Sequence, residues 1–190
     1  MRVVAGALRG RTLEAPQGDG TRPTIDRVRE ALFSSLYSLR GGFEDAQVLD
    51  AFAGSGALGI EALSRGARHA VFYEHDAKAA AVVKRNLAAC GLGPDSAVVC
   101  KRDVLASVPT GASPAFDLVF LDPPYQYDAN RVLAMVAELR QSGALESGAI
   151  VVYEHDIKQK GAVAEAAEQA QLAVHASKKY GKTGVTILIA

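Results

Sequence analysis

The sequence predicts an α/β fold built on a mostly parallel, doubly wound sheet. From residue 47 onward, short apolar runs alternate with segments of helical periodicity, and this alternation is typical of strand–helix–strand units. Near the end of the chain, two extended segments flank the turn-forming residues 181–184. They predict an antiparallel hairpin added at one edge of the sheet, which makes seven strands in all.

Each element follows from its own pattern. Five strands are predicted from apolar runs, at 47–50, 70–73, 97–100, 117–121 and 149–153. Helices are predicted between and after them, at 57–64, 77–89, 104–108, 130–142 and 162–171. The closing hairpin is expected over 174–179 and 185–189.

A separate N-terminal piece precedes this domain. Short extended stretches are broken at Gly6, Gly10 and Pro16, so residues 1–22 are predicted to be a small β-hairpin extension outside the main domain, which then spans 23–190. A helix opens at Pro23-Thr24 and ends at Gly41-Gly42, with apolar residues on one face.

The charge of the chain is unevenly distributed. Lysine and arginine number 21, as do aspartate and glutamate, so the formal net charge is zero. Residues 1–40 nevertheless carry seven arginines against four acidic residues, a net of +3. Arginine binds phosphate in a bidentate manner, so this segment favours a nucleic-acid partner, although a solvated hairpin with ordinary surface charge explains it equally well.

The composition excludes several classes of protein. A chain of 190 residues with 49% hydrophobic and 22% charged residues can bury a core. It has no apolar run long enough for a membrane span and no signal-peptide pattern, so we expect a cytoplasmic protein with no membrane association. Cys90 and Cys100 form no metal-type pair, and the repeated Tyr-Glu-His-Asp at residues 73 and 153 is interpreted as chance, so no metal is predicted.

A glycine-rich turn follows the first strand. In Asp50-Ala51-Phe52-Ala53-Gly54-Ser55-Gly56, the two glycines let the backbone pass close beneath a ligand at the carboxyl end of the sheet. Asp50, at the strand tip, can receive the ammonium group of an amino acid directly or through water. This combination predicts S-adenosylmethionine as the ligand.

A dinucleotide is the alternative ligand of this turn. Gly54-Ser55-Gly56-Ala57-Leu58-Gly59 also matches the nicotinamide-cofactor fingerprint. That site needs its first glycine right at the strand end, whereas Gly54 lies further on, and Asp50 would repel a pyrophosphate. The methyl donor is therefore favoured over NAD.

Two acidic residues at later strand ends fit an adenosine-containing ligand. Glu74 follows the second strand, where a carboxylate can bind both ribose hydroxyls. Asp103, followed by Val104, lies after the third strand, where it would accept a hydrogen bond from the adenine amine. An ordinary helix cap explains Asp103 equally well.

The fourth strand runs into Asp122-Pro123-Pro124-Tyr125. The two prolines fix the backbone, so that the Asp122 carboxylate and the Pro123 carbonyl can point at one spot. Two acceptors placed there would hold the hydrogens of an exocyclic amine on a base and free its lone pair for attack on a methyl carbon. Tyr125 offers a face on which a flipped base can stack. A rigid turn with a surface tyrosine is the plain alternative.

Together these motifs resemble the RsmD family, the 16S ribosomal RNA guanine-N2 methyltransferases. The resemblance covers nearly the whole chain. It is carried by Arg2-Val3-Val4-Ala5-Gly6 with Arg9-Gly10-Arg11, by Thr21-Arg22-Pro23-Thr24 running into residues 26–33, by residues 50–62, by Asp122-Pro123-Pro124-Tyr125 and by Tyr180-Gly181-Lys182-Thr183. The departures are mild: Phe52 stands where leucine is common, and His75 follows Glu74.

The resemblance implies a Rossmann-like class I methyltransferase that uses S-adenosylmethionine. The residues that would hold the cofactor are Asp50, Ala51, Gly54, Ser55, Gly56, Glu74, Asp103 and Val104. Asp122, Pro123 and Tyr125 would hold the guanine amine, and Arg9, Arg11, Arg22 and Arg27 would contact RNA. The implied partner is 16S ribosomal RNA or an assembling small subunit, bound by a monomer.

Three other functions remain open at this point. A DNA adenine amino-methyltransferase would share the chemistry but would usually carry a target-recognition insertion, which this chain lacks. An NAD-binding oxidoreductase is supported by the glycine fingerprint alone. A non-catalytic RNA-binding module is disfavoured by the intact Asp122 and Glu74.

Overall fold

The computed structural model of the protein describes residues 1–15 and 23–190, which form two compact units. Unit 1 spans Met1–Arg102 and unit 2 spans Asp103–Ala190. The strands form one mixed sheet in the order β3-β2-β1-β4-β5-β7-β6, which confirms the predicted fold class. The predicted division of the chain at residue 22 stays a prediction.

The described residues of unit 1 form three parallel strands and three helices. Its helices are α1 (Pro23–Arg40), α2 (Ala57–Ser64) and α3 (Ala77–Ala89), and its strands are β1 (Gln47–Asp50), β2 (His69–Tyr73) and β3 (Ala97–Cys100). β1 pairs with β2 and β2 with β3, so Asp50 stands beside Phe72 at the carboxyl ends of the strands. The polar residues that follow β1 and β2 therefore meet at one edge.

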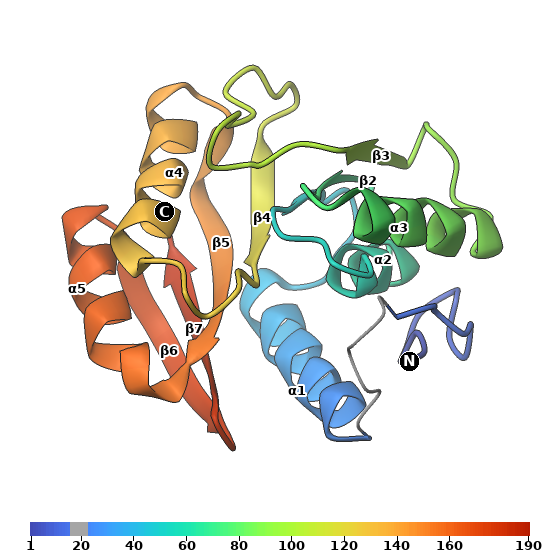
Figure 1. Cartoon of the computed structure of the whole chain (residues 1–190), viewed down its shortest axis with the longest axis horizontal. Helices are drawn as coiled ribbons and strands as arrows, with labels where there is room; N and C mark the ends of the chain where they lie inside the picture. The colour runs from blue at the N-terminus through green and yellow to red at the C-terminus, as the bar shows by residue number, and fades with distance from the viewer. Residues whose placement is uncertain (16–22) are drawn as a thin grey trace. The chain divides into compact units, whose positions relative to one another are not determined.

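Unit 2 contains the other four strands. They are β4 (Phe116–Leu121), β5 (Leu145–Asp156), β6 (Ala173–Tyr180) and β7 (Thr183–Ile189). β4 and β5 are parallel, whereas β7 runs antiparallel to both β5 and β6. The helices α4 (Ala129–Gln141) and α5 (Lys160–Gln169) lie side by side, and the 3-10 turn η1 (Ile157–Gln159) precedes α5 (Figure 1).

Local chemistry explains where the helices begin. The Asp76 side chain accepts hydrogen bonds from the backbone N–H of Lys78 and Ala79 at the start of α3, and Asp128 accepts one from Asn130 at the start of α4. Such caps satisfy N–H groups that have no partner inside the helix. At the sheet, strand side chains such as Leu49, Phe72, Leu118 and Phe120 are fully buried.

The helix predicted over 104–108 is wrong. Residues 104–106 form a turn, in which the backbone oxygen of Asp103 accepts hydrogen bonds from the N–H groups of Ala106 and Ser107. The next residue, Val108, precedes Pro109, whose ring disfavours helical backbone in the residue before it. A single turn is therefore all that this segment can form.

Within unit 1, the N-terminal segment (residues 1–15) packs closely on α2. A single antiparallel bridge joins Arg2 to Thr12, and Val3 and Leu13 are buried. Glu61 in α2 is fully buried and accepts hydrogen bonds from the backbone N–H of Val4 and Ala5. The segment is therefore held to α2 through its own backbone, in addition to its apolar contacts.

The Glu61 carboxylate is balanced by two arginines. Arg65 Nε lies 2.8 Å from it and Arg29 Nε 3.6 Å. Arg29 also donates to the backbone oxygen of Arg2 and to Asp26. Each buried charge in this cluster has an opposite partner, as burial of charge in a protein requires.

Candidate functional site

The glycine turn connects β1 to α2 and takes backbone conformations that favour glycine. Gly54 has a φ of 55° and Gly56 a φ of 79°, both in the left-handed region. A Cβ atom on Gly54 would meet no other atom within 4 Å, so the backbone there faces open space. The turn therefore exposes main chain at Gly54, and contact between this turn and a cofactor stays a prediction.

Gly59, the third glycine of the fingerprint, is needed for packing. A Cβ atom on Gly59 would lie 2.3 Å from Phe72 Cε1 and 3.2 Å from Asp50 Oδ2. The helix α2 therefore approaches β1 and β2 more closely than any side chain at this position would permit. The third glycine of a dinucleotide fingerprint has the same packing role, so the motif alone does not discriminate between the two cofactors.

Asp50 is buried beneath the turn, with 1% of its surface exposed. Its Oδ2 accepts a hydrogen bond of 3.0 Å from the backbone N–H of Gly59. Because the N-cap residue of α2, Gly56, has no capping side chain, Asp50 satisfies an N–H group of the first helical turn from outside the helix. The carboxylate thus fixes the shape of the glycine turn.

Burial dominates the ionisation of Asp50. Desolvation raises the pKa of its carboxyl to about 7; the hydrogen bond from Gly59 opposes the rise and the charge of Glu74 adds to it. A carboxyl with this pKa is populated in both its protonated and its ionised form near neutral pH. Perturbed groups of this kind are concentrated at functional sites.

Glu74 reaches the same turn from the end of β2. Its Oε2 accepts a hydrogen bond of 2.9 Å from the Gly54 N–H, and its Oε1 accepts one of 2.8 Å from the Asp76 N–H. A carboxylate has about four acceptor positions, so Glu74 keeps capacity for the hydroxyl groups of a ligand. Asp50, Gly54, Ser55, Gly56 and Glu74 are thus gathered at one edge of unit 1, with Ala51 buried next to Asp50.

One residue at this turn was missed by the sequence reasoning. Asn86 in α3 is buried and donates hydrogen bonds to the backbone oxygens of Ser55 and Glu14. It therefore joins the glycine turn to the N-terminal segment. Its signal was weak, because a lone asparagine on a helix is usually a surface residue.

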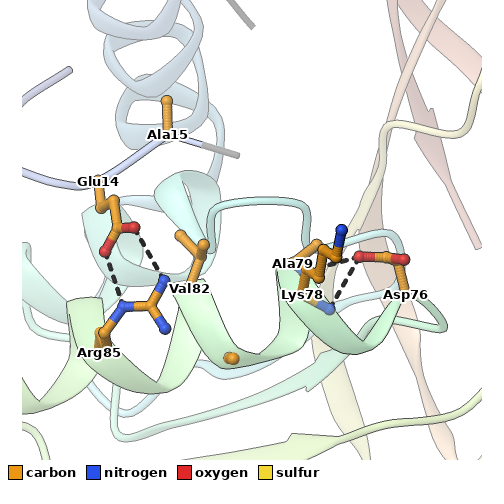
Figure 2. Close-up of a pocket in the computed structure, with 8 residues that line it drawn as sticks. Glu14, Ala15, Asp76, Lys78, Ala79, Val82 and Arg85 are labelled. Carbon is orange, nitrogen blue, oxygen red and sulfur yellow. Dashed lines mark hydrogen bonds and ion pairs between the residues drawn. The ribbon is translucent and has the colours of Figure 1, made fainter. Parts of the chain in front are cut away.

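A groove of about 540 Å³ lies along α3 (Figure 2). Three of its charged side chains already have partners: Glu14 and Arg85 form a bidentate ion pair of 2.8 Å, and Asp76 caps α3. The groove therefore presents little unpaired polarity, and we do not assign it a ligand. Its lining residues are Glu14, Ala15, Asp76, Lys78, Ala79, Ala81, Val82 and Arg85.

In unit 2, Asp103 and Val104 open the turn that follows Arg102. Asp103 Oδ1 accepts a hydrogen bond of 2.9 Å from the Leu105 N–H, and Val104 is buried. Asp103 therefore has a capping role in the structure. Contact between Asp103 and an adenine amine stays a prediction.

The Asp122-Pro123-Pro124-Tyr125 segment follows β4 directly. Asp122 and Tyr125 are exposed, whereas Pro123 is buried. Tyr125 Oη lies 3.0 Å from Thr183 Oγ1, and the Tyr125 backbone oxygen accepts a hydrogen bond of 2.9 Å from Gln159 Nε2. The phenol is held by Thr183 of β7 and the backbone by Gln159 of η1, although 44% of the surface of Tyr125 is exposed.

The charged side chains near Tyr125 are carboxylates. Desolvation raises the pKa of the Tyr125 phenol, the hydrogen bond with Thr183 lowers it, and the charges of Glu154, Asp122 and Asp156 raise it further. Tyr125 is therefore neutral near pH 7, and its face is suited to stacking. Three carboxylates lie close enough to influence it.

The predicted RNA-contacting arginines are exposed where the structure describes them. Arg9, Arg11 and Arg27 are exposed, and Arg22 lies outside the described residues. The turn that carries Arg9 is held at the last residue of α2, where the backbone N–H groups of Ala7 and Leu8 donate to Ser64. Arg9 therefore lies toward the end of α2 opposite the glycine turn.

Two structural tests bear on other kinds of site. Within residues 1–15 and 23–190, no group of three or more His, Cys, Asp or Glu side chains could hold a metal ion. In the same part of the chain, no helix is long and apolar enough to cross a membrane.

Comparison with known proteins points to methyltransferases. The model of the family described as "Conserved hypothetical protein 95" matches residues 1–189. The Haemophilus influenzae ribosomal RNA small subunit methyltransferase D is 39% identical over 140 residues, 73% of this chain and 71% of that protein. The Escherichia coli protein of the same name is 37% identical over 158 residues, 83% of this chain and 76% of that protein.

A solved structure shows the same fold over the full length. The Escherichia coli protein yhhF superposes with a TM-score of 0.80 at 31% sequence identity, covering 100% of this chain and 97% of that one. The predicted resemblance to the RsmD family is confirmed by these matches together.

Proposed function

We propose a function for this chain, which belongs to the family "Conserved hypothetical protein 95". It is an S-adenosylmethionine-dependent methyltransferase that acts on the exocyclic N2 amine of a guanine in 16S ribosomal RNA. The observation that carries the proposal is the Asp122-Pro123-Pro124-Tyr125 segment at the tip of β4, with an exposed carboxylate and an anchored, exposed aromatic ring. Neither a DNA-recognition insertion nor a dinucleotide site is needed to explain these features.

The hydrogen-bond acceptors of unit 1 fit S-adenosylmethionine as the ligand. An amino acid joined to an adenosine has an ammonium group and two ribose hydroxyls, all of them hydrogen-bond donors. Asp50 and Glu74 are the acidic groups at the glycine turn, and Gly54 leaves space for close approach. S-adenosylmethionine supplies a sulfonium-bound, electrophilic methyl carbon when it is bound there.

The residues of unit 2 prepare the amine. The Asp122 carboxylate and the Pro123 carbonyl would each accept one N2 hydrogen, which frees the lone pair that is otherwise delocalised into the ring. Positive charge develops on the nitrogen as the methyl group is transferred, so fixed acceptors stabilise the transition state more than the ground state. Tyr125, held by Thr183 and Gln159, would stack on the extruded base.

Transfer to ribosomal RNA is the direct test of this function. Small ribosomal subunits or 16S RNA lacking the modification should gain N2-methylguanosine when incubated with the protein and S-adenosylmethionine. Mass spectrometry of nucleosides after digestion measures the product and distinguishes it from N6-methyladenosine. Methylation of adenine alone, or of no nucleoside, would contradict the proposal.

The arginines of the N-terminal segment should contribute to RNA affinity through phosphate contacts. Replacing Arg9 and Arg11 together by alanine is expected to weaken binding and to reduce the slope of log K against log salt by about 1 to 2, since each phosphate contact releases about one counterion. Binding of 16S RNA or small subunits at several salt concentrations measures this slope.

The matched control keeps the charge. Arg9→Lys with Arg11→Lys preserves both cations and should retain the salt slope, while losing the bidentate guanidinium geometry. A slope that is equal in the alanine and wild-type proteins would place the RNA surface elsewhere on the chain.

The remaining features of the proposal concern the setting of the enzyme. We propose that residues 1–22 are an RNA-facing extension, that the protein is a cytoplasmic monomer, and that its partner is 16S RNA within the assembling small subunit. The modest net charge of the chain fits a partner whose proteins supply part of the docking surface.

A further inference from the structure

The second Tyr-Glu-His-Asp stretch, at the end of β5, has one side chain whose role is unexplained. Tyr153 is buried in the core. His155 is buried too, with Nδ1 2.8 Å from the Asp156 backbone oxygen and Nε2 3.0 Å from Thr186 Oγ1. Asp156 accepts a hydrogen bond from the Lys158 N–H at the start of η1. Glu154 is the residue of this stretch whose side chain has no role assigned so far.

Glu154 lies beside the amine-holding segment. Leu121 and Tyr153 are register partners in the parallel β4–β5 pair, so the next residues along, Asp122 and Glu154, are neighbours at the strand ends. Alternation along β5 turns Glu154 away from the face shared by Tyr153 and His155, whose rings are 5.6 Å apart. The charges of Glu154 and Asp122 both raise the pKa of the Tyr125 phenol.

The Glu154 carboxyl is partly buried at the end of β5. Desolvation raises its pKa, and no hydrogen bond to it is found among the residues that the structure describes. Glu154 is half-buried rather than fully enclosed, so its carboxylate is partly desolvated and is still open to a donor from outside the protein. Such a group is satisfied when a ligand brings the donor.

Guanine, the base of the proposed function, has a hydrogen-bond donor next to its exocyclic amine. In guanine, the atom adjacent to the N2-bearing carbon on the Watson–Crick edge is N1, which carries a hydrogen. In adenine and cytosine, the ring nitrogen in the corresponding position beside the exocyclic amine has a lone pair and no hydrogen. A carboxylate therefore attracts guanine at this atom and repels the other two bases.

We propose that Glu154 accepts the N1 hydrogen of the target guanine and thereby selects guanine for methylation. This inference rests on the proposed function and adds to it the group that reads the base. Asp122 and Pro123 recognise an amine, which adenine and cytosine also have. Glu154 is the neighbouring acceptor that distinguishes guanine from them.

The test compares guanine with 2-aminopurine, which keeps the 2-amine but has an N1 lone pair in place of N1–H. Small subunits are assembled on 16S RNA in which the mapped target position is one base or the other, introduced by splinted ligation. The wild-type protein should prefer guanine by at least about 10- to 100-fold in kcat/KM, the usual worth of one hydrogen bond to a charged group.

Glu154→Gln should change this preference rather than merely lower activity. The amide oxygen can accept only a weaker, uncharged bond from guanine N1–H, and the amide N–H can donate to the N1 lone pair of 2-aminopurine, so the preference for guanine over 2-aminopurine should fall about 10- to 100-fold. Glu146→Gln, at the exposed opposite end of β5, is the matched control and should leave both substrates unaffected. Binding of S-adenosylhomocysteine and thermal unfolding verify that each variant is folded.

The outcomes separate this inference from the function beneath it. Equal use of guanine and 2-aminopurine by the wild-type protein would overturn the role of Glu154, whether or not the variant folds. So would a Glu154→Gln protein that loses activity on both bases by the same factor. Absence of guanine methylation by the wild-type protein would instead refute the proposed function itself.

Discussion

Replacement of Asp122 by alanine is expected to lower kcat for methyl transfer by about 10²- to 10³-fold, the usual effect of removing one fixed group that stabilises transition-state charge. Binding of S-adenosylhomocysteine should stay within about twofold of wild type, because the acidic groups at the glycine turn, Asp50 and Glu74, are unchanged. Transfer of a tritiated methyl group to 16S RNA and isothermal titration measure the two quantities separately.

Asp122→Asn is the matched control for this experiment. The amide oxygen can still accept one amine hydrogen, so this variant should keep more activity than Asp122→Ala. The order wild type, asparagine, alanine is what an acceptor of hydrogen bonds predicts. Full activity in the alanine variant would mean that another group holds the amine.

The fold was predictable because its elements are marked locally. The segments that form β1, α2 and α3 have polar or glycine residues near their ends, and their bounds agree with the prediction to within one residue. β5 is longer than predicted, 12 residues from Leu145 to Asp156. Its ends are defined by partners, since Leu145 pairs with Phe116 and Asp156 pairs with Thr183, and such pairing is invisible in a local pattern.

The residues of the candidate site can be proposed from the sequence, whereas most of their contacts within the protein cannot. Motif spacing identified the glycine turn and the residues after β4. It did not reveal that Asp50 caps α2 or that Thr183 holds the Tyr125 hydroxyl. Those contacts join residues that are close only in space, and their side chains also have ordinary uses in turns and caps. The Tyr180-Gly181-Lys182-Thr183 stretch carries part of the family resemblance, and the contact of Thr183 with the Tyr125 hydroxyl gives a physical reason for its last residue.

Asp50 should make the ligand-free protein less stable as the pH rises. Its folded pKa of about 7 lies above the ordinary 3.8, so the folded state holds a proton that the unfolded state has released between these values. Its contribution to stability is fully present below pH 3.8 and is lost as the pH rises through 7. The loss amounts to about 4 kcal/mol in total, at about 1.4 kcal/mol per pH unit.

Asp50→Asn isolates this effect. The amide oxygen can still accept the Gly59 N–H, but the buried charge is gone. The free energy of unfolding of the variant relative to wild type should therefore increase by about 3 kcal/mol between pH 5 and pH 8, measured with urea on the ligand-free proteins. Asp50→Ala, which also loses the contact to Gly59, should be less stable than Asp50→Asn at both pH values.

A charge that is costly to the ligand-free fold needs a compensating use, and the ammonium group of the cofactor is the one we predict. S-adenosylhomocysteine, which has the same ammonium group, should bind Asp50→Asn about 10- to 100-fold more weakly than wild type at pH 8. Wild-type affinity should also fall by up to about tenfold per pH unit below pH 7, because Asp50 must lose its proton, and the variant should not show this dependence. If the variant binds as tightly as wild type and both proteins respond equally to pH, the carboxylate serves only to shape the glycine turn, and the ammonium is held by other groups.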